Sequence, residues 1–396
     1  MKDKFLSSRM KAYDLAVILM VAQVMLDKIT YIEGDMLSKL FTVASLGIFL
    51  LVIFLENRYT LAQTIVIAVV GIITVYSGIR MSEYFLVMTL ILSLASLEKD
   101  TERTILLMHR TKMFFVVISV AWYILFEIIP GNEPLTILTG QHNDHKFGFS
   151  HANAFALIVT WMIFERVYLY FDKIKTRHIV AVAFSGPLVF YLTACDTAMY
   201  VLVFATLVLA LGRVRVIEKL MGFGAKIVFP VMAVINALFI YLYADGTSRI
   251  HEFLLDLDKA LSARIREAAQ LYSIYDATLF GQSVDLGGEV PYDSYYRITT
   301  LICDGLFSYL FVCFGFASTI ILTVMIYYTA KKGSKRDWIM IFIYTMYAII
   351  ESHGLNAYLA FPILLYQCNF FKSFNKIDKG KTDTINVRER EVLSDG

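Results

Sequence analysis

Long runs of apolar residues, separated by short polar connections, fill the chain from about residue 13 to about residue 371. A helix that crosses a membrane needs about 20 mostly apolar residues. Twelve stretches approach this requirement, although the eighth and the eleventh are short. They are 13–31, 38–55, 59–78, 81–97, 113–129, 152–171, 178–194, 197–212, 225–244, 299–328, 338–350 and 356–371. The pattern predicts an all-α, polytopic integral membrane protein with 11–12 transmembrane helices.

The composition supports this fold class. The chain has 396 residues, of which 58% are hydrophobic and only 18% are charged, whereas soluble domains average about 45–50% apolar and about 25% charged residues. These proportions exclude a soluble globular protein, a disordered chain and a nucleic-acid-binding protein. The four cysteines form no CxxC pair, so we expect small core- or lipid-facing residues rather than a disulfide framework or a zinc ribbon.

The distribution of Lys and Arg predicts the orientation. With a cytoplasmic N-terminus, most of these residues fall on the cytoplasmic side, as the positive-inside rule requires. The short outer connections then carry only Lys28, Lys39, Arg80 and Lys146. We therefore expect a multi-pass protein of the cytoplasmic membrane with both termini in the cytoplasm.

Two outer connections are long, at about 130–151 and about 245–298. Within the second, apolar residues recur at helical spacing over 251–275, which predicts one amphipathic helix on the membrane surface or over the mouth of a cavity. We expect residues 1–375 to form a single transmembrane domain and residues 376–396 to form a disordered cytoplasmic tail.

Polar residues suited to chemistry concentrate on the predicted outer side. His142, His145 and His151 fall within 140–156, but their spacing does not place them on one helix face, so no metal site is expected. One interpretation is a solvated loop. The other is that His151 and Asn153 begin the sixth helix, whose free N–H groups suit an anionic or hydroxyl-rich ligand.

Further candidates occur at the ends of other predicted helices. Asp196 lies in an almost loop-free connection and either caps the following helix or lines a polar cavity. Arg264 borders the apolar face of the loop helix, and Arg297 lies where the loop re-enters the membrane. Arginine binds phosphate oxygens in a fork, although interfacial arginines are often simple anchors.

Aromatic and acidic residues complete the set. Tyr292 and Tyr296, beside Asp293, form either an interfacial belt or a surface for sugar rings. Glu351 and His353 follow the eleventh helix. A carboxylate at that depth indicates function by default, and a solvated helix end is the alternative.

Four stretches together resemble the Wzy-type polysaccharide polymerases, membrane enzymes that polymerise lipid-linked repeat units of O-antigens, capsules and exopolysaccharides. Lys146 to Asn153 is similar to the family's basic-residue, Gly-Phe, His-Pro-Asn signature, and Thr193 to Thr197 takes the place of a Thr/Ser-rich turn. Leu261 to Gly281 is similar to its loop-helix arginine with a Leu-Phe-Gly turn, and Asp293 to Gly305 to its re-entering Asp, aromatic and Gly pattern.

Two positions depart from the family pattern. Ala152 stands where the family usually has Pro, which matters little at the start of a helix. Asp196 stands where the family often has Arg, which places a phosphate-binding role for that turn in doubt.

The resemblance implies transfer of an oligosaccharide from undecaprenyl pyrophosphate to a sugar hydroxyl of a second lipid-linked unit, on the outer leaflet of the lipid bilayer. It implies that Arg264 and Arg297 stabilise the leaving phosphates and that His151, Asp293 or Glu351 is the base. It implies no cofactor and no metal, and a chain-length regulator and a flippase as partners. The substrate-binding residues would be Lys146, Asn153, Asp196, Tyr292, Tyr296 and Arg297.

Two other functions remain open. An O-antigen-ligase-like transferase would use a similar donor and a different acceptor. A polysaccharide-lipid flippase or transporter would suit the number of helices, but transporters often contain repeats. The two halves of this chain show no such similarity.

Overall fold

The computed structural model is all-α and describes residues 2–30, 35–129, 145–247, 249–289 and 300–375. A further helical segment covers 362–375. The fifteen numbered α-helices are α1 (Lys2–Leu26), α2 (Asp35–Leu55), α3 (Leu61–Met81), α4 (Phe85–Ala95), α5 (Thr101–Tyr123), α6 (Ala152–Leu169), α7 (Thr176–Thr193), α8 (Asp196–Leu211), α9 (Arg215–Gly224), α10 (Val228–Asp245), α11 (His251–Ala260), α12 (Arg264–Ile274), α13 (Leu306–Tyr309), α14 (Gly315–Lys332) and α15 (Lys335–Ile350).

Every range that the sequence predicts to be a membrane helix contains helical structure. In the described residues, six helices are long and apolar enough to cross a membrane by length and composition. The helix predicted over 81–97 is shorter than predicted. Ser82 adopts a left-handed conformation (φ 59°) that ends α3, and α4 then spans only 11 residues. The six helices that are long and apolar enough to cross a membrane are Met36–Leu55, Leu61–Met81, Thr101–Ile128, Ala152–Leu169, Val228–Asp245 and Leu306–Lys332.

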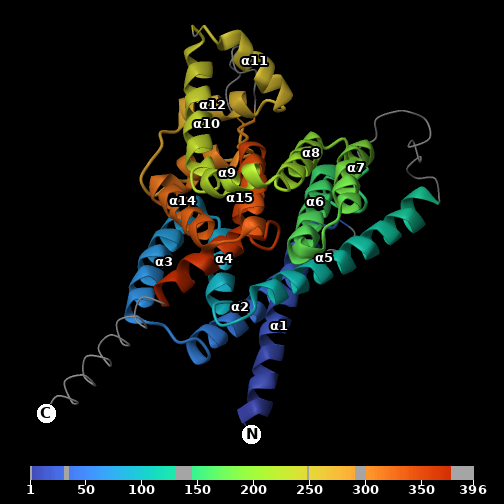
Figure 1. Ribbon diagram of the computed structural model, residues 1–396, viewed down its shortest axis with the longest axis vertical. Coiled ribbons are helices and arrows are strands. Elements are labelled where there is room, and N and C mark those ends of the chain that lie inside the picture. The colour runs from blue at the N-terminus through green and yellow to red at the C-terminus, as the bar shows by residue number, and fades with distance from the viewer. Residues whose placement is uncertain (1, 31–34, 130–144, 248, 290–299, 376–396) are drawn as a thin grey trace, which may run out of the picture.

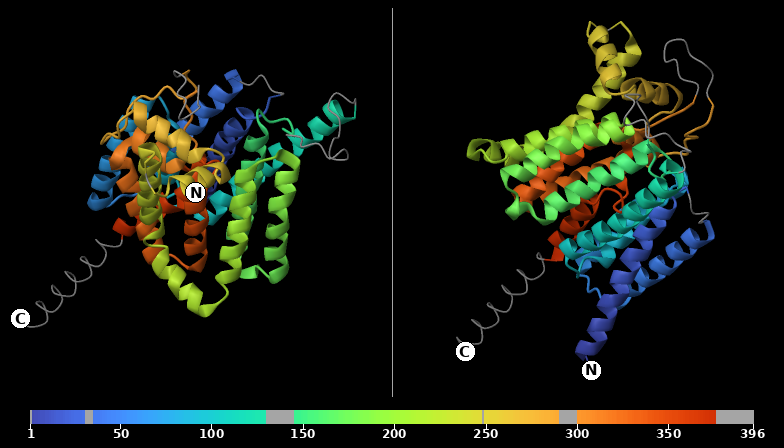
Figure 2. Two further views of the ribbon diagram at one scale, coloured as in Figure 1. Left: turned by 90° about the horizontal axis from the view of Figure 1, so that it is seen from above. Right: turned by 90° about the vertical axis from the view of Figure 1, so that its right-hand side faces the viewer.

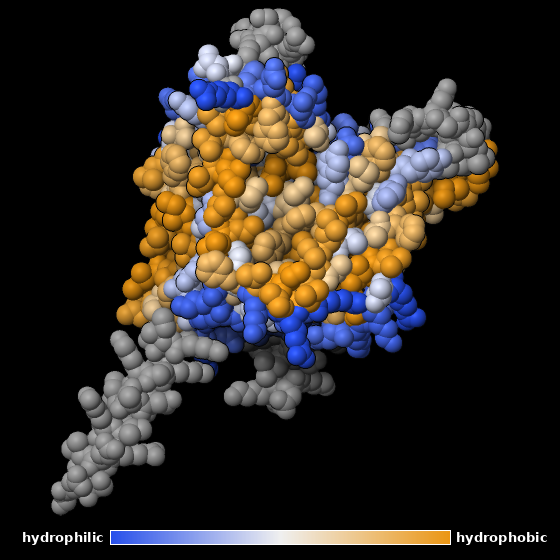
Figure 3. All heavy atoms as spheres, turned by 45° about the horizontal axis from the view of Figure 1, so that its top comes forward, coloured by the Kyte–Doolittle hydropathy of each residue, from blue (hydrophilic) through white to orange (hydrophobic). Residues whose placement is uncertain are grey.

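The helices form a bundle with distinct ends (Figure 1). The first helix, α1, begins at the end where the 362–375 segment also finishes, whereas α11 and α12 project beyond the opposite end (Figure 2). The two long helices α3 and α10 expose most of their apolar windows, of which only 28% and 22% are buried inside the protein. One face accordingly shows a broad apolar band with polar side chains at both ends (Figure 3), a surface suited to lipid.

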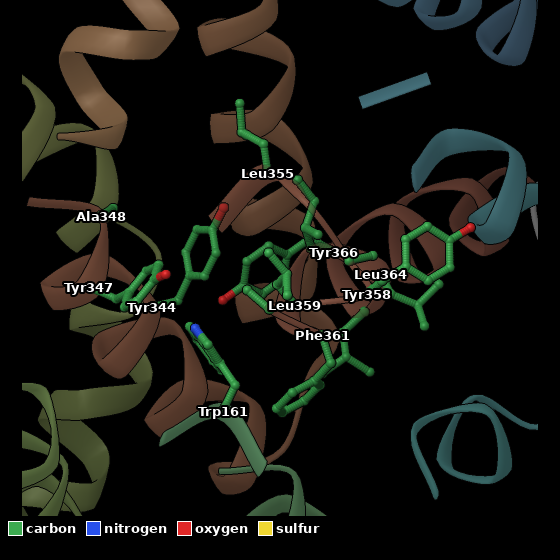
Figure 4. Close-up of a cluster of buried hydrophobic side chains, with 14 of the residues drawn as sticks. Trp161, Tyr344, Tyr347, Ala348, Leu355, Tyr358, Leu359, Phe361, Leu364 and Tyr366 are labelled. Atoms are coloured by element: carbon green, nitrogen blue, oxygen red, sulfur yellow. The ribbon is translucent and has the colours of Figure 1, made fainter. Parts of the chain in front are cut away.

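An aromatic core joins α6 and α15 to residues 355–366 (Figure 4). The Trp161 ring meets the Tyr347 ring edge-on, with centroids 4.9 Å apart, and the Tyr344 and Tyr366 rings meet at 5.2 Å. Such contacts stabilise by about 0.5–1.5 kcal/mol beyond burial alone. The core fixes the outer end of α15, where Glu351 lies. All four cysteines are free and buried, which confirms that they face the core.

A buried ion pair joins α5 to α6. Lys112 is fully buried, and its ammonium group donates to Glu165 at 2.5 Å and to the carbonyl of Leu359 at 3.0 Å. The second carboxylate oxygen of Glu165 lies 3.2 Å from His109. Three parts of the chain that are distant in sequence therefore meet at the Lys112 ammonium group.

The outer loop contains two helices rather than the one predicted over 251–275. Ser262 and Ala263 take left-handed conformations (φ 53° and 71°), which end α11 and turn the chain before α12. The Asp258 carboxylate stabilises this corner by accepting the Arg266 backbone N–H at 2.9 Å. The predicted apolar face is largely correct, because Leu254 and Ile265 are buried against the outer end of α10.

The chain leaving α12 docks into the break between α13 and α14. The N–H groups of Phe316 and Ala317 donate to the carbonyls of Thr278 and Leu279 at 3.0 and 2.9 Å. The Ser77 hydroxyl donates to the carbonyl of Phe280 at 2.9 Å. A π-helical turn over Leu310–Phe314 separates α13 from α14. The described part of the long loop is thus held by α10, against which α11 and α12 pack, and by the docking of residues 278–282.

Candidate functional site

Arg264 is the centre of a charged cluster at the end of the bundle from which α11 and α12 project. It begins α12, and its Nη1 atom lies 2.8 Å from Asp304 Oδ2 and 3.0 Å from Glu267 Oε2. Its Nε–H group donates to the carbonyl of Ile350, the last residue of α15, at 3.2 Å. Only 13% of the side chain is exposed, so Arg264 joins the loop to the bundle in a largely desolvated position.

Glu351 completes the cluster from the end of α15. The side chain is 6% exposed, and its Oε1 atom accepts a hydrogen bond from the Thr197 hydroxyl at 3.1 Å. Thr197 lies in the first turn of α8. The charged side chains therefore come from α12, the segment before α13 and the end of α15, and α8 contributes the Thr197 hydroxyl. We call Arg264, Glu267, Asp304 and Glu351 the Arg264 cluster.

One guanidinium lies near three carboxylates here, and the pKa values of these groups reflect the excess of negative charge. Burial raises the pKa of Glu351 to about 7, and repulsion from Asp304 adds to this shift while Arg264 opposes it. Burial likewise raises the pKa of Glu267 to about 7, against the attraction of Arg264. Burial alone would lower the pKa of Arg264, but Asp304, Glu267 and Glu351 raise it above its ordinary value. Two carboxyl groups can thus hold or release a proton near neutral pH, as general acid–base chemistry requires.

A cavity of about 670 Å³ opens beside the cluster, with Asp304 in its wall. The Asp304 side chain is 38% exposed, whereas Glu351 is buried and does not line the cavity. Carboxylates, amides and aromatic rings in one wall suit a ligand rich in hydroxyl groups. Other polar lining residues include Gln23, Asp27, Lys28, Glu83, His353 and Asn356, and the aromatic ones are Tyr84, Phe85, Tyr309 and Tyr358.

Lys28 faces this cavity from the end of α1. Its carbonyl accepts the N–H of Ser150 at 2.8 Å, and the Thr30 N–H donates to Gly148 at 3.0 Å, so the segment before α6 is bound to the end of α1. His353 lines the same cavity. The surrounding protein and the positive charge of Lys28 lower the pKa of His353 to about 4, which leaves its ring neutral near neutral pH.

The predicted residues around α6 lie apart from the cluster. Lys146, His151 and Asn153 are exposed, and none of them lines the 670 Å³ cavity. His151 is the N-cap residue of α6 but makes no side-chain capping bond. His145 is buried with a ring nitrogen 2.8 Å from the Tyr123 hydroxyl. Within the described residues, no group of three or more His, Cys, Asp or Glu side chains is arranged to hold a metal ion.

Asp196 lies next to the cluster but is not a helix cap. The N-cap residue of α8 is Cys195, and Asp196 follows it in the first helical turn, so the capping interpretation is wrong. The Asp196 carboxylate instead accepts a hydrogen bond from Ser262 at 3.4 Å, which links the start of α8 to the corner between α11 and α12.

The remaining predicted residues fall in a segment that the structure does not describe. Tyr292, Asp293, Tyr296 and Arg297 lie between 290 and 299, and His142 lies between 130 and 144. Their predicted roles stay predictions.

Sequence reasoning missed several residues of the site. Glu267 carried a usable signal, because residues three apart on a helix lie on one face and can pair with each other. Thr197, Asp304 and Lys28 gave no comparable signal as site residues, because their neighbours come from distant helices. Of the predicted catalytic residues, the structure brings Arg264 and Glu351 together.

The fold defines an all-α, multi-pass membrane protein. A buried arginine–carboxylate cluster lies at the end of the bundle from which α11 and α12 project, beside a polar cavity. Comparisons with models of known families, with curated proteins and with solved structures find no match.

Proposed function

We propose that the protein polymerises undecaprenyl-pyrophosphate-linked oligosaccharide repeat units on the outer face of the cytoplasmic membrane, in capsule or exopolysaccharide biosynthesis. The observation that carries this proposal is the Arg264 cluster beside the 670 Å³ cavity. Such a site combines proton-accepting groups with a lining suited to sugars, next to helices suited to a lipid tail. The resemblance of the four sequence stretches supplies the choice of reaction.

The reaction needs a base and a place for the leaving group. The acceptor hydroxyl oxygen forms a bond to the anomeric carbon of the donor, and the bond from that carbon to the pyrophosphate breaks. The electron pair leaves with the lipid pyrophosphate, and the hydroxyl proton passes to a carboxylate. Asp304 is the cluster carboxylate in the cavity wall, so we assign it the proton-accepting role, with Glu351 and Glu267 behind it.

This arrangement changes the role of Arg264 from the one that the resemblance implies. Its guanidinium is held by Asp304 and Glu267 and lies near Glu351, so its positive charge is already balanced. Arg264 then positions Asp304. Lys28 faces the cavity and, among the described residues, forms no ion pair with a carboxylate. It is therefore the better candidate to stabilise the leaving phosphates.

The proposed partners follow from the reaction. A flippase would deliver the lipid-linked units to the outer leaflet, and a chain-length regulator would set the length of the polymer. The bilayer holds both substrates by their polyprenyl tails.

The test is polymer formation in proteoliposomes supplied with lipid-pyrophosphate-linked repeat units, read as a ladder on a gel. We expect the wild-type protein to form a ladder and Asp304→Asn to lose it. Glu252→Gln changes an exposed carboxylate on α11 and should leave the ladder unchanged. A normal ladder from Asp304→Asn would remove that residue from the reaction.

Gene deletion separates the alternatives. A polymerase deletion leaves single repeat units at the cell surface. Finished polymer retained on its lipid indicates a ligase, repeat units trapped on the cytoplasmic side indicate a flippase, and unchanged glycans contradict all three functions.

A further inference from the structure

A second cavity lies at the other end of the bundle, far along α6, α7 and α8 from the Arg264 cluster. It has a volume of about 330 Å³ and is bounded by the last turns of α6, the first turns of α7 and the end of α8. Its wall is almost entirely apolar, and its rim carries Arg166, Lys173 and His178. The apolar lining includes Ile163, Val167, Ile174, Ile179, Val182 and Leu209. We call this cavity the α6–α8 groove.

The cations at its rim have no acidic partner. The Arg166 guanidinium lies over the Tyr170 ring at 4.0 Å, and within the described part of the chain neither Arg166 nor Lys173 belongs to an ion pair. Two nearby carboxylates are already engaged, since Glu165 pairs with Lys112 and Glu218 pairs with Lys335.

The short connection from α6 to α7 reinforces the positive charge. Asp172 is its one carboxylate, against Lys173 and Lys175, and Arg177 follows in the first turn of α7. Within the part of the chain that the structure describes, the rim therefore carries more positive than negative charge.

The groove is held open by hydrogen bonds rather than by loose packing. Arg213, just beyond α8, donates to the Thr176 hydroxyl at 2.8 Å and to the Ile174 carbonyl at 3.1 Å. These bonds fix the connection between α6 and α7 against the end of α8. Neighbouring side chains on α7 face outward, as the 72% exposure of Phe184 shows, so the groove borders a surface suited to lipid.

We propose that the α6–α8 groove binds an anionic phospholipid. An acyl chain lies against the apolar wall, and the phosphate group lies between Arg166 and Lys173 at the rim. The chemistry favours this occupant over two others. A free inorganic anion would leave the apolar wall unfilled, and a zwitterionic lipid would bring a cation of its own to a rim that is already positive. Basic pockets between membrane helices are recognised sites for anionic head groups. This inference does not depend on the proposed function.

The experiment compares lipid retention on the purified full-length protein by native mass spectrometry. The probes are phosphatidylglycerol and phosphatidylcholine with identical acyl chains. We expect selective retention of phosphatidylglycerol. Each rim cation should contribute about fivefold to the affinity, so the double variant Arg166→Gln/Lys173→Gln should lose about 25-fold and approach the affinity for phosphatidylcholine.

Two further variants separate charge from shape. Arg177→Gln removes an exposed cation that does not line the groove and should leave retention unchanged. Ala181→Trp fills the apolar part without changing any charge and should weaken phosphatidylglycerol binding. Size-exclusion profiles confirm that each variant folds. If the double variant misfolds, the single variant Lys173→Gln still tests the proposal. Its side chain is exposed, so its replacement should not disturb folding.

Three results would overturn the inference. One is equal retention of the two lipids by the wild-type protein. Another is undiminished phosphatidylglycerol binding by the folded rim variant. The third is inorganic phosphate competing equally well with the lipid in wild-type and Ala181→Trp protein, which would indicate a free-anion site.

Discussion

The guanidinium of Arg264 lies 2.8 Å from the carboxylate of Asp304, although one residue begins a loop helix and the other precedes a membrane helix. This pair fastens α12 to the segment before α13, at the point where Asp304 enters the cavity wall. The position of the proposed base therefore depends on a residue from another part of the chain.

Replacing Arg264 by Ala should abolish polymer formation while protein remains in the membrane. The change leaves Glu267 and Asp304 without their cation, and breaking a buried pair in this way costs about 3–5 kcal/mol. Gel ladders and thermal unfolding of the purified protein measure the two effects. Lys259→Ala breaks an ion pair whose side chains are 78% exposed, so it should change neither. Polymer of normal length from Arg264→Ala would remove Arg264 from the site.

Stability should fall as pH rises between about 4.5 and about 7. Burial raises the pKa of Glu351 from 4.5 to about 7, so the folded protein binds more protons than the unfolded chain in this window. Stability is then fully present below about pH 4.5 and is lost as pH rises through about 7, with a slope up to about 1.4 kcal/mol per pH unit per carboxyl. Glu351→Gln should flatten the unfolding profile, and Glu252→Gln should not. If the free energy of unfolding depends on pH identically in wild type and Glu351→Gln, the raised pKa of Glu351 is contradicted.

Alanine at Gly281 should prevent the outer loop from docking. Gly281 has a φ of +79°, and a Cβ atom there would lie 2.0 Å from the carbonyl oxygen of Cys313. We expect little folded protein from Gly281→Ala. Gly287→Ala should lower the free energy of unfolding by only about 1 kcal/mol. Gly287 is the matched control because its φ is +86° and no atom lies within 4 Å of the added Cβ. Yield and unfolding temperature in detergent distinguish the two variants, and equal behaviour would show that the docked conformation is not needed.

Replacing one member of the buried Lys112–Glu165 pair should destabilise the protein more than replacing both members. Lys112→Met leaves a buried carboxylate without its ammonium partner and should destabilise the protein by about 3–5 kcal/mol. The double variant Lys112→Met/Glu165→Leu should recover part of this loss, because no uncompensated charge remains. Thermal unfolding of both variants gives the comparison. Additive losses would show that the two charges do not interact.

A cysteine at position 256 should be labelled from outside the cell by a membrane-impermeant reagent. Asp256 lies on α11 with 78% of its side chain exposed, and the four native cysteines are buried, so background labelling is low. Labelling only after the cytoplasmic side is opened would reverse the predicted orientation. A cysteine at Lys219, an exposed residue of α9, should show the opposite pattern.

The sequence predicts the helices of the bundle well, because each buries or exposes a long apolar surface that is visible in its own residues. The break between α11 and α12 is harder to predict, since Ser262 and Ala263 carry no Gly or Pro signal and the turn depends on the Asp258 side chain. Arg264 and Glu351 are recognisable because charged residues near membrane helices are conspicuous. Their contacts with Asp304 and Thr197 are tertiary contacts between residues distant in sequence, so no local sequence pattern predicts them.

The docking of residues 278–282 between α13 and α14 bears on the order in which the site is assembled during synthesis. The loop helices leave the ribosome before the segments that hold them, so Arg264 meets Asp304 and Ile350 only after the late helices have been made. A nascent chain released before α15 would carry Arg264 and Glu267 without Glu351. In such a fragment the charges around Arg264 would differ from those of the finished protein, because Glu351 and the Ile350 carbonyl belong to the missing segment.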